Sequence, residues 1–139
     1  MRQAGYTLLE LLVVLAIVGL ISGAVLPMFA ASRPGLQARA AARAIAQDFR
    51  TARQAAISSG AKTRVVMNRA ANRYAILPDG PARVLPKGIA FSVQTAGSGD
   101  EIDFFPDGSS SGGAVIVQSG GANHRIVAHW PSGRISLDE

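Results

Sequence analysis

The chain has 139 residues, a length that allows one small domain with a modest core. It contains no cysteine, which excludes a disulfide framework and thiolate metal sites, and its two histidines are too few for most metal centres. The net charge of +5 is unevenly spread, because residues 33–87 carry eleven Arg and Lys against two acids, whereas residues 88–139 carry two against six.

The first thirty residues consist of a short leader and a long apolar stretch. Residues 1–5 carry one charge and end in glycine, and residues 11–31 contain no charge and a single polar side chain, Ser22. As a helix rising about 1.5 Å per residue, this stretch reaches about 32 Å, enough to cross a bilayer core of about 30 Å. Glu10 lies at its start, where a carboxylate in hydrocarbon is costly and is expected to have a functional partner.

Two simple interpretations explain only part of this segment. A secretory signal peptide has a shorter apolar stretch, of about 7 to 15 residues, although the small residues near Phe29-Ala30-Ala31 resemble a cleavage site. A plain single-span anchor explains the length but explains neither Glu10 nor the glycine at position 5.

The segment Gly5-Tyr6-Thr7-Leu8-Leu9-Glu10 with its apolar continuation closely resembles the class III signal of type IV pilins and type II secretion pseudopilins. The resemblance implies that a prepilin peptidase cuts between Gly5 and Tyr6 and methylates the new amino terminus of Tyr6, where the family usually has Phe. Glu10 matches the family's assembly glutamate. The α-amine that cleavage frees has a pKa of about 8 and is largely protonated at neutral pH. The resulting cation can pair with the Glu10 carboxylate in lipid. The alternative is a glutamate that only reaches the headgroups.

Glycine and proline interrupt the apolar stretch and then end it. Gly19 and Gly23 have the G-x-x-x-G spacing that lets helices approach closely, and Pro27 is expected to kink or loosen the helix. Arg33-Pro34-Gly35 predicts a break. A second, alanine-rich helix is expected at about 36–58, ending near Gly60 as a C-terminal cap.

This second helix is amphipathic. Its apolar stripe should pack on a sheet, and its polar stripe should face solvent, a neighbour or headgroups. The apolar stripe comprises Ala41, Ile45, Phe49, Ala52 and Ala56, and the polar stripe comprises Arg39, Arg43, Gln47, Arg50 and Gln54.

After Gly60 the pattern changes to short apolar runs separated by turn residues, which predicts antiparallel sheet. A hairpin is expected first, with strands at 63–68 and 74–77 around residues 69–72. The further predicted strands are 89–94, 102–105, 114–118, 125–130 and 134–137.

Two segments of the second half carry a narrower resemblance. Residues 102–113, which include Phe105-Pro106-Asp107-Gly108, resemble the F-x-P-x-G-x-[ST]-x-G-G signature of H-type minor pseudopilins and FimT-like minor pilins. Residues 127–135, with the Gly133-Arg134 pair, resemble their terminal hairpin. Pro106-Asp107-Gly108 suits a tight turn, and Gly112-Gly113 permits positive φ or a bulge.

The candidate chemical sites are weak. The acids Asp100, Glu101, Asp103 and Asp107 could suggest calcium, but their spacing does not match an EF-hand loop. Serines 109–111 with His124 or His129 could suggest a hydrolase, but there is no Gly-x-Ser-x-Gly elbow, and no P-loop follows the glycines.

The resemblance identifies the chain as an H-type minor pseudopilin with an α+β pilin-like fold, in which a long hydrophobic helix continues into an amphipathic helix packed on antiparallel sheet. It implies a leader at 1–5, a transmembrane and assembly helix at 6–31, and a periplasmic domain at 32–139, β-rich from 62. The implied partners are prepilin peptidase, inner-membrane lipid, the inner-membrane assembly platform and other major and minor pseudopilins. Together these subunits would form a pseudopilus that drives export of folded proteins across the outer membrane. No enzyme activity, cofactor, metal or catalytic residue is implied.

Two alternatives remain. A FimT-like minor pilin of pilus assembly or DNA uptake shares the fold, and Arg39, Arg43, Arg50 and Arg134 are the candidate interaction residues. Nucleic acid is the less favoured partner, because a single arginine follows Gly133 and the chain ends in two acids. A single-span anchored protein unrelated to pili would be unaffected in its processing by Gly5→Ala. The charge polarity also suggests that the basic half of one subunit faces the acidic turns of the next.

Overall fold

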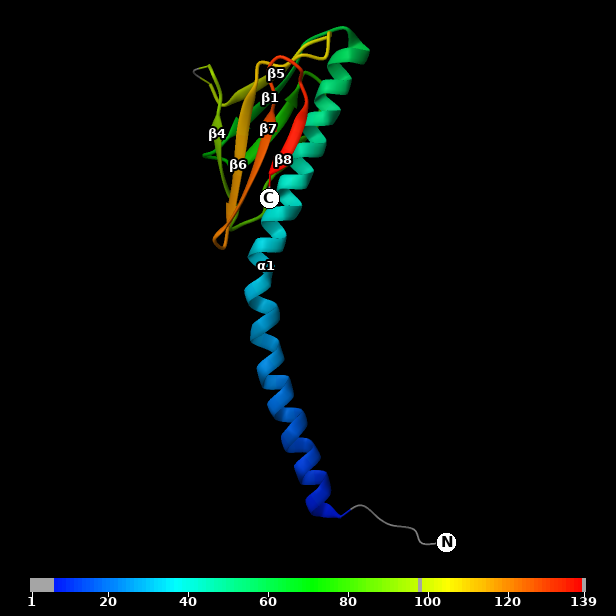
Figure 1. Ribbon diagram of the computed structural model, residues 1–139, viewed down its shortest axis with the longest axis vertical. Coiled ribbons are helices and arrows are strands. Elements are labelled where there is room, and N and C mark those ends of the chain that lie inside the picture. Colours follow the sequence, from blue (N-terminus) through cyan, green and yellow to red (C-terminus); the bar gives the residue numbers. More distant parts are fainter. Residues whose placement is uncertain (1–6, 98, 139) are drawn as a thin grey trace, which may run out of the picture. The chain divides into compact units, whose positions relative to one another are not determined.

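The computed structural model describes residues 7–97 and 99–138, except that the side chains of residues 23–34 are not described. One helix, α1, is followed by eight strands (Figure 1). The helix is Leu8–Ser59, and the strands are β1 Thr63–Asn68, β2 Arg73–Leu77, β3 Ala82–Val84, β4 Ala90–Gln94, β5 Glu101–Phe104, β6 Gly113–Ser119, β7 Ala122–Ala128 and β8 Ile135–Asp138. The chain divides into two compact units, residues 1–33 and 34–139.

The predicted helix break at Arg33-Pro34-Gly35 is wrong, because the backbone stays helical through it and through Pro27. A proline ring fixes φ near the helical value and removes one hydrogen bond, so the alanine-rich sequence that follows continues the helix. In the described part of the chain, no helix combines the length and the hydropathy needed to span a bilayer. The predicted span 6–31 includes residue 6 and side chains 23–31, which lie outside that description.

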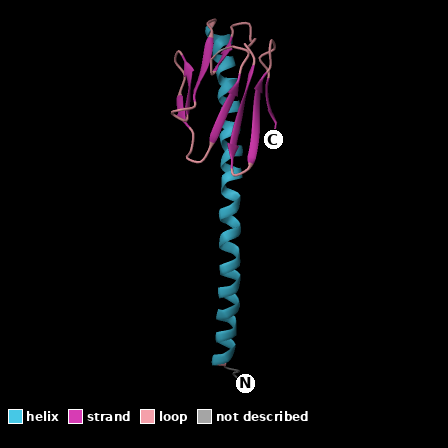
Figure 2. Ribbon diagram, turned by 90° about the vertical axis from the view of Figure 1, so that its left-hand side faces the viewer, coloured by secondary structure: helices cyan, strands magenta, loops and turns pink. Residues whose placement is uncertain are grey.

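The strands form two four-stranded antiparallel sheets, with orders β3-β2-β1-β5 and β4-β6-β7-β8 (Figure 2). The predicted β1–β2 hairpin is confirmed, with Asn72 at φ 47 in its turn. The other predicted strands are also found, and their bounds agree within a few residues. The largest difference is at β7, which is predicted at 125–130 and runs from Ala122 to Ala128. The sequence did not predict β3, whose three residues are all exposed and show no alternation.

The core of unit 34–139 lies between α1 and the two sheets. The predicted apolar stripe is confirmed, because all five of its side chains are buried. The Phe49 ring meets Phe104 of β5 edge-on, with centroids 6.0 Å apart, and full burial of one such ring is worth about 1.5–3 kcal/mol. Gly60 has φ +66 and caps the C-terminal end of α1, as predicted.

Candidate assembly and interaction sites

Thr7 and Glu10 form the start of α1. The Glu10 N–H donates to Thr7 Oγ1 at 3.3 Å and to the Thr7 carbonyl at 3.1 Å, so Thr7 acts as the N-cap. The Thr-x-x-Glu spacing is that of a capping box, and a carboxylate in the first turn suits the helix dipole. Gly5 and Tyr6, the predicted cleavage and methylation residues, lie outside the described residues.

The described apolar side chains on either side of Glu10, up to Ile21, are exposed in the structure. Leu8 is 79% exposed, and a Cβ built on Gly19 would meet no atom within 4 Å. The large hydrophobic side chains exposed on this segment are Leu8, Leu9, Leu11, Leu12, Val13, Val14, Leu15, Ile17, Val18, Leu20 and Ile21. Such a surface requires lipid or another apolar helix.

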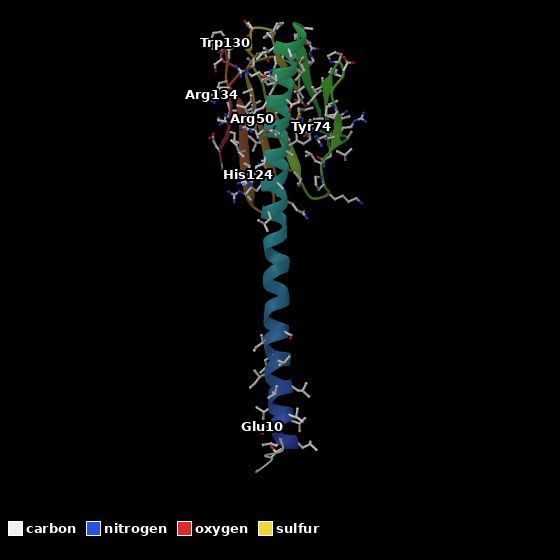
Figure 3. All side chains as sticks on the ribbon, turned by 90° about the vertical axis from the view of Figure 1, so that its right-hand side faces the viewer. Glu10, Arg50, Tyr74, His124, Trp130 and Arg134 are labelled. Carbon is white, nitrogen blue, oxygen red and sulfur yellow. The ribbon has the colours of Figure 1, made fainter. Side chains whose placement is uncertain are left out.

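The four predicted interaction arginines do not form one cluster. Arg39, Arg43 and Arg50 lie exposed on α1, as the polar stripe predicts. Arg134 is exposed on the turn before β8, and its side chain has no hydrogen bond or ion pair among the described residues. Only Arg50 lies near the end of α1 that contacts this turn, one helical turn before Arg53 (Figure 3). Arg39 and Arg43 precede Arg50 by seven residues or more, which is about 10 Å along a helix.

Arg53, which the sequence did not single out, joins the two signature segments. Its Nε donates to the Gly108 carbonyl at 2.8 Å, and its Nη2 donates to the Ser132 carbonyl at 3.3 Å. One guanidinium on α1 therefore fixes both the Pro106-Asp107-Gly108 turn and the turn that leads into β8. We define this contact as the Arg53 junction.

The signature glycines allow the close packing at this junction. A Cβ on Gly133, which has φ +62, would collide with the Gly108 carbonyl, and one on Gly108, at φ +83, would lie 3.1 Å from Arg53 Nη2. A Cβ on Gly112, at φ +76, would lie 2.9 Å from the Trp130 Cβ. The signature therefore specifies how two turns pack against α1, and its glycines do not mark a phosphate loop.

Trp130 lies at the tip of the turn that the Arg53 junction holds. Its side chain is 74% exposed, although its backbone is fixed by neighbouring hydrogen bonds. The Gly133 N–H donates to the His129 carbonyl at 2.8 Å, and the His129 N–H donates to the Arg134 carbonyl at 2.9 Å. We call residues 129–134 the Trp130 turn.

A buried carboxylate fixes α1 against the first sheet. Asp48 accepts a hydrogen bond from the Tyr74 hydroxyl at 2.6 Å and from Arg83 Nε at 2.5 Å. Burial raises the pKa of Tyr74, and the hydrogen bond to Asp48 raises it further, so the hydroxyl stays protonated. Since the carboxylate has both a cation and a donor, this group serves structure and shows no sign of catalysis.

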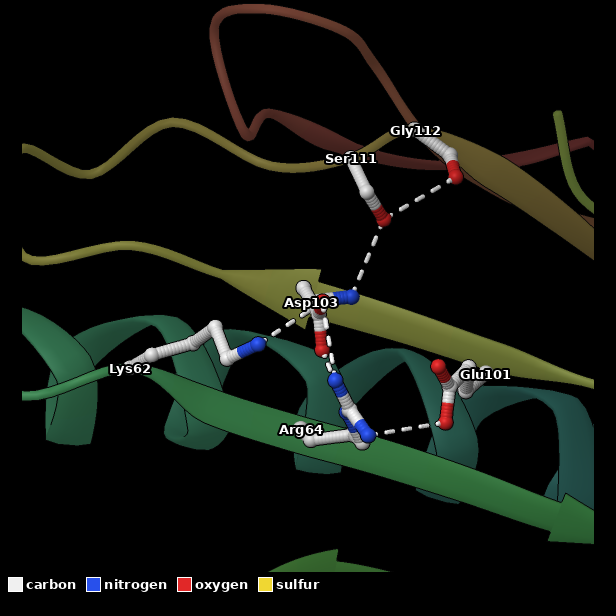
Figure 4. A network of polar contacts seen from close by, with 6 residues as sticks. All are labelled: Lys62, Arg64, Glu101, Asp103, Ser111 and Gly112. Atoms are coloured by element: carbon white, nitrogen blue, oxygen red, sulfur yellow. Dashed lines mark hydrogen bonds and ion pairs between the residues drawn. The ribbon is translucent and has the colours of Figure 1, made fainter. Parts of the chain in front are cut away.

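The acids considered for calcium have partners within the chain (Figure 4). Asp103 accepts from Arg64 Nε at 2.7 Å and from Lys62 Nζ at 3.3 Å, while Glu101 lies 3.1 Å from Arg64 Nη1. Partial burial opposes ionisation of Asp103, but the hydrogen bonds and charges of Arg64 and Lys62 outweigh it and lower its pKa. Among the described residues, no three His, Asp or Glu side chains form a possible metal site.

Asp100 and Asp107 also have local partners. Asp100 accepts from Arg69 Nε at 2.8 Å, and Asp107 accepts from the Ser109 hydroxyl at 2.6 Å, which lowers its pKa. Three of the four acids, Asp100, Glu101 and Asp103, therefore pair with cations of the basic half of the same chain. The numbers of basic and acidic residues therefore overstate the unpaired charge that is available to a neighbouring subunit.

Among the described residues, serines 109–111 do not pair with either histidine, as the predicted hydrolase site would require. His129 Nε2 lies 2.9 Å from Ser136 Oγ, and His124 is buried on β7 with no partner for Nδ1 among the described residues. The Ser110 hydroxyl accepts from Gly112 N–H, and the Ser111 hydroxyl accepts from Asp103 N–H. Their hydrogen bonds stabilise the signature segment.

Two family models match this chain: the prokaryotic N-terminal methylation motif over residues 1–26 and type II transport protein GspH over residues 41–132. Type II secretion system protein H of Xanthomonas campestris is 29% identical over 137 residues, covering 94% of this chain and 80% of the relative. Competence protein ComGD of Bacillus subtilis is 24% identical over 137 residues, covering 99% of this chain and 94% of the relative.

Two kinds of solved structure share the fold. The minor pseudopilin EpsH from the type 2 secretion system of Vibrio cholerae matches with a TM-score of 0.62 at 15% identity, covering 73% of this chain and 95% of that chain. The type IV minor pilin FimU of Pseudomonas aeruginosa matches with a TM-score of 0.58 at 14% identity, covering 73% and 92%.

Proposed function

The chain belongs to the GspH family of type II secretion minor pseudopilins, and we propose that it assembles into a pseudopilus that drives export of folded proteins across the outer membrane. The pilin-like α+β fold and the methylation motif, both predicted from the sequence, are confirmed. The family consists of structural proteins and not of enzymes. The observation that carries the proposal is the GspH match over residues 41–132, which includes Arg53 and the two residues, Gly108 and Ser132, whose carbonyls it binds.

The N-terminal segment has features that would hold the chain in the inner membrane before it joins the filament. The methylation motif implies an inner-membrane anchored pseudopilin, and we infer cleavage after Gly5 and methylation of Tyr6. The exposed apolar face after Glu10 has the chemistry to exchange lipid for neighbouring helices. In that environment the Glu10 carboxylate would partner the amine of its own chain or of a neighbour.

We infer that the periplasmic domain contacts the other pseudopilins. Prepilin peptidase and the inner-membrane assembly platform would act on the N-terminal segment, and the major and other minor pseudopilins would surround the chain in the filament. Supporting this, the described residues provide exposed groups suited to protein contacts, such as Trp130 and Arg50. No cofactor has a part in the proposal.

Glu10→Ala tests the assembly role. We expect cleavage after Gly5 to continue, while incorporation into sheared filaments and secretion of a reporter protein fall strongly, because the amine of the neighbouring chain loses its charge partner in a low-dielectric core. Processing is measured by the shift in mass of the membrane-bound chain. Glu101→Ala, which removes a partly exposed acid of the domain, is the control and should incorporate normally. Normal incorporation of the Glu10 variant would contradict the proposal.

The alternative function is that of a minor pilin in DNA uptake. The relative named competence protein ComGD favours it, since that match covers 99% of this chain, and the exposed Arg50 and Arg134 lie on the same end of the domain. Against it, a single arginine follows Gly133, and Asp138 closes the last strand. Phosphate binding depends on several neutralised contacts.

A gel-shift experiment separates the two functions. Residues 32–139 are titrated onto double-stranded and single-stranded DNA at physiological salt, with Arg134→Ala as the variant and Arg73→Ala, an exposed arginine on β2, as the control. We expect weak binding that both variants reduce equally. Tight binding that only Arg134→Ala abolishes would favour DNA uptake.

A further inference from the structure

Trp130 presents an indole to the surroundings of the domain. Its side chain is 74% exposed, whereas Phe49, Tyr74, Phe91 and Phe104 are buried. Covering an indole removes a large apolar surface from water, and Trp and Arg are enriched among the residues that dominate binding energy at protein interfaces. A single exposed apolar residue is nevertheless ordinary, so a contact site requires neighbours that also suit a partner.

The backbone of the Trp130 turn is held by two other segments of the domain. The Arg53 junction fixes it to α1, and the Ser110 N–H of the signature segment donates to the Pro131 carbonyl at 3.3 Å. The Trp130 Cβ packs against Gly112, where an added Cβ would lie only 2.9 Å from it. A partner therefore meets a side chain on a preorganised turn, which lowers the entropy cost of binding.

A hollow of about 480 Å³ opens beside the Trp130 side chain. Its lining residues are mostly apolar or small, and they include Ala96, Gly112, Gly113, Val127, Ala128 and Trp130. A partner side chain in this hollow would contact the indole directly. One apolar surface on a partner can therefore cover the hollow and the indole together.

The charge beside Trp130 is mainly positive. Arg134 is exposed on the same flank of α1 (Figure 3), and its side chain has no hydrogen bond or ion pair among the described residues. The Arg53 guanidinium donates to two carbonyls, which carry no net charge. The signature turn adds one acid, Asp107, which accepts a hydrogen bond from Ser109. This balance favours a partner that brings a carboxylate.

We propose that the Trp130 turn docks on a different pseudopilin of the same filament, in an apolar pocket with a carboxylate at its rim. In this contact Trp130 fills the pocket, and Arg134 pairs with the carboxylate. The contact rests on the proposed function, in which major and other minor pseudopilins surround this minor subunit, and it specifies the surface through which one of them binds.

A protein fits this surface better than single-stranded DNA does. Stacked bases require several aromatic side chains along a basic groove. Of the aromatic side chains that the structure describes, only Trp130 is exposed, and the four predicted interaction arginines do not form one cluster. The Trp130 turn therefore has one anchor and one cation, which suits a pocket on a folded partner.

Photo-cross-linking of the full-length chain in cells tests the contact. The photoreactive residue p-benzoylphenylalanine replaces Trp130, and the other pseudopilins of the same cells are tagged one at a time. The control is the same replacement at Val84 on β3, whose side chain is also 74% exposed. We expect about tenfold more cross-linked heterodimer from position 130 than from position 84, with the cross-linked peptide of the partner rich in apolar residues and containing Asp or Glu.

Side-chain variants test the chemistry of the contact. With p-benzoylphenylalanine at the exposed Ser132 instead, Trp130→Ala should reduce the cross-link about tenfold, and Trp130→Phe should reduce it less. Arg134→Glu should also weaken the cross-link, and a change of the partner's carboxylate to Arg should restore it. Thermal unfolding in detergent should be the same for all variants, since both side chains are exposed.

Three results would overturn the proposal. They are equal cross-linking from positions 130 and 84, cross-linking only to a second copy of this chain, and no loss of the cross-link with Trp130→Ala. A gel shift of single-stranded DNA by the full-length chain in detergent, abolished by Trp130→Ala, would assign the turn to nucleic acid instead. Incorporation into filaments is measured in the same cells. Normal incorporation without a cross-link from position 130 refutes this contact alone, whereas absence of the chain from filaments refutes the proposed function.

Discussion

Arg53 connects α1 to two turns that are distant from it in sequence. It lies at the edge of the buried face of α1 and donates to two carbonyls, at Gly108 and Ser132, that are far apart in sequence. Each carbonyl belongs to a turn whose glycines leave room for the guanidinium. The position of Trp130, and with it the exposed end of the domain, therefore depends on a residue that is itself half-buried.

We expect Arg53→Ala to destabilise the domain by about 1–3 kcal/mol, because two turn carbonyls lose a charged donor. Urea unfolding of residues 34–139, followed by circular dichroism, measures the change. Arg50→Ala is the matched control, one turn earlier on α1, and should alter stability by no more than about 0.5 kcal/mol since its side chain is exposed. Similar losses in both variants would contradict the importance of the junction.

Asp103 gives the domain a pH-dependent contribution to stability. The pKa of the Asp103 carboxyl is lower in the folded chain than in the unfolded chain, where an Asp side chain has a pKa of about 3.9. The contribution is therefore present above that unfolded value and is lost as the pH falls through the folded value. We expect the stability difference between the natural chain and Asp103→Asn to be constant near neutral pH and to shrink below about pH 4.

Thermal unfolding over a pH series checks this expectation. Because the ion pairs with Arg64 and Lys62 are partly exposed, about 1 M salt should also reduce the difference. A difference that stays constant down to about pH 2 would show that Asp103 acts through packing alone.

At the level of elements, α1 organises both sheets and ends at a defined residue. Asp48 connects it to β2 and β3, Phe49 to β5, and Arg53 to the turns before β6 and β8. The helix ends at Ser59, and Gly60 at φ +66 turns the chain into β1. The direction in which the chain enters β1 therefore depends on the left-handed conformation of Gly60.

We expect Gly60→Ala to destabilise the domain by about 1 kcal/mol, because a side chain in the left-handed region is strained. Gly60→Asn should cost less, since Asn tolerates this conformation better. Gly97→Ala is the control: no positive φ is required there, and a Cβ would meet no atom within 4 Å. Urea midpoints that rank Asn below Ala at position 60 would contradict the cap.

Sequence periodicity predicted most elements and missed those that lack it. The apolar stripe of α1 was predicted because Ile45 and Phe49 repeat at helical spacing, whereas β3 has three exposed residues and no alternation. The break at 33–35 was wrong because proline and glycine lower helix propensity without forbidding the helix. The Arg53 junction joins positions 55 and 79 residues apart through backbone carbonyls, which leave no trace in a side-chain pattern.

At the level of the whole molecule, the two compact units differ in the exposure of their described apolar side chains. Among the residues whose side chains are described, the core of unit 34–139 begins at Ala38, and the partly buried side chains packed against it end at Leu137. The described residues before position 23 expose Leu, Val and Ile side chains instead. The domain thus has a hydrophobic core built from its own described residues.

We expect removal of residues 1–33 to leave a soluble domain with the secondary structure and thermal stability of the same domain in the full-length chain. The reason is that none of the buried core residues is lost. Calorimetry of residues 34–139, compared with the full chain in detergent, measures this. Phe49→Ala is the control for sensitivity, and it should lower stability by about 3–5 kcal/mol. A large loss on truncation would show that the apolar segment supports the fold.

The Arg53 junction has a chemical property that makes it insensitive to pH. A guanidinium keeps its charge at every pH that a bacterium meets, and carbonyl oxygens do not titrate at all. The junction therefore holds its geometry when acid or salt weakens the carboxylate pairs of Asp103. A change in pH or salt concentration can therefore weaken the ion pairs of Asp103 while the Trp130 turn stays in place.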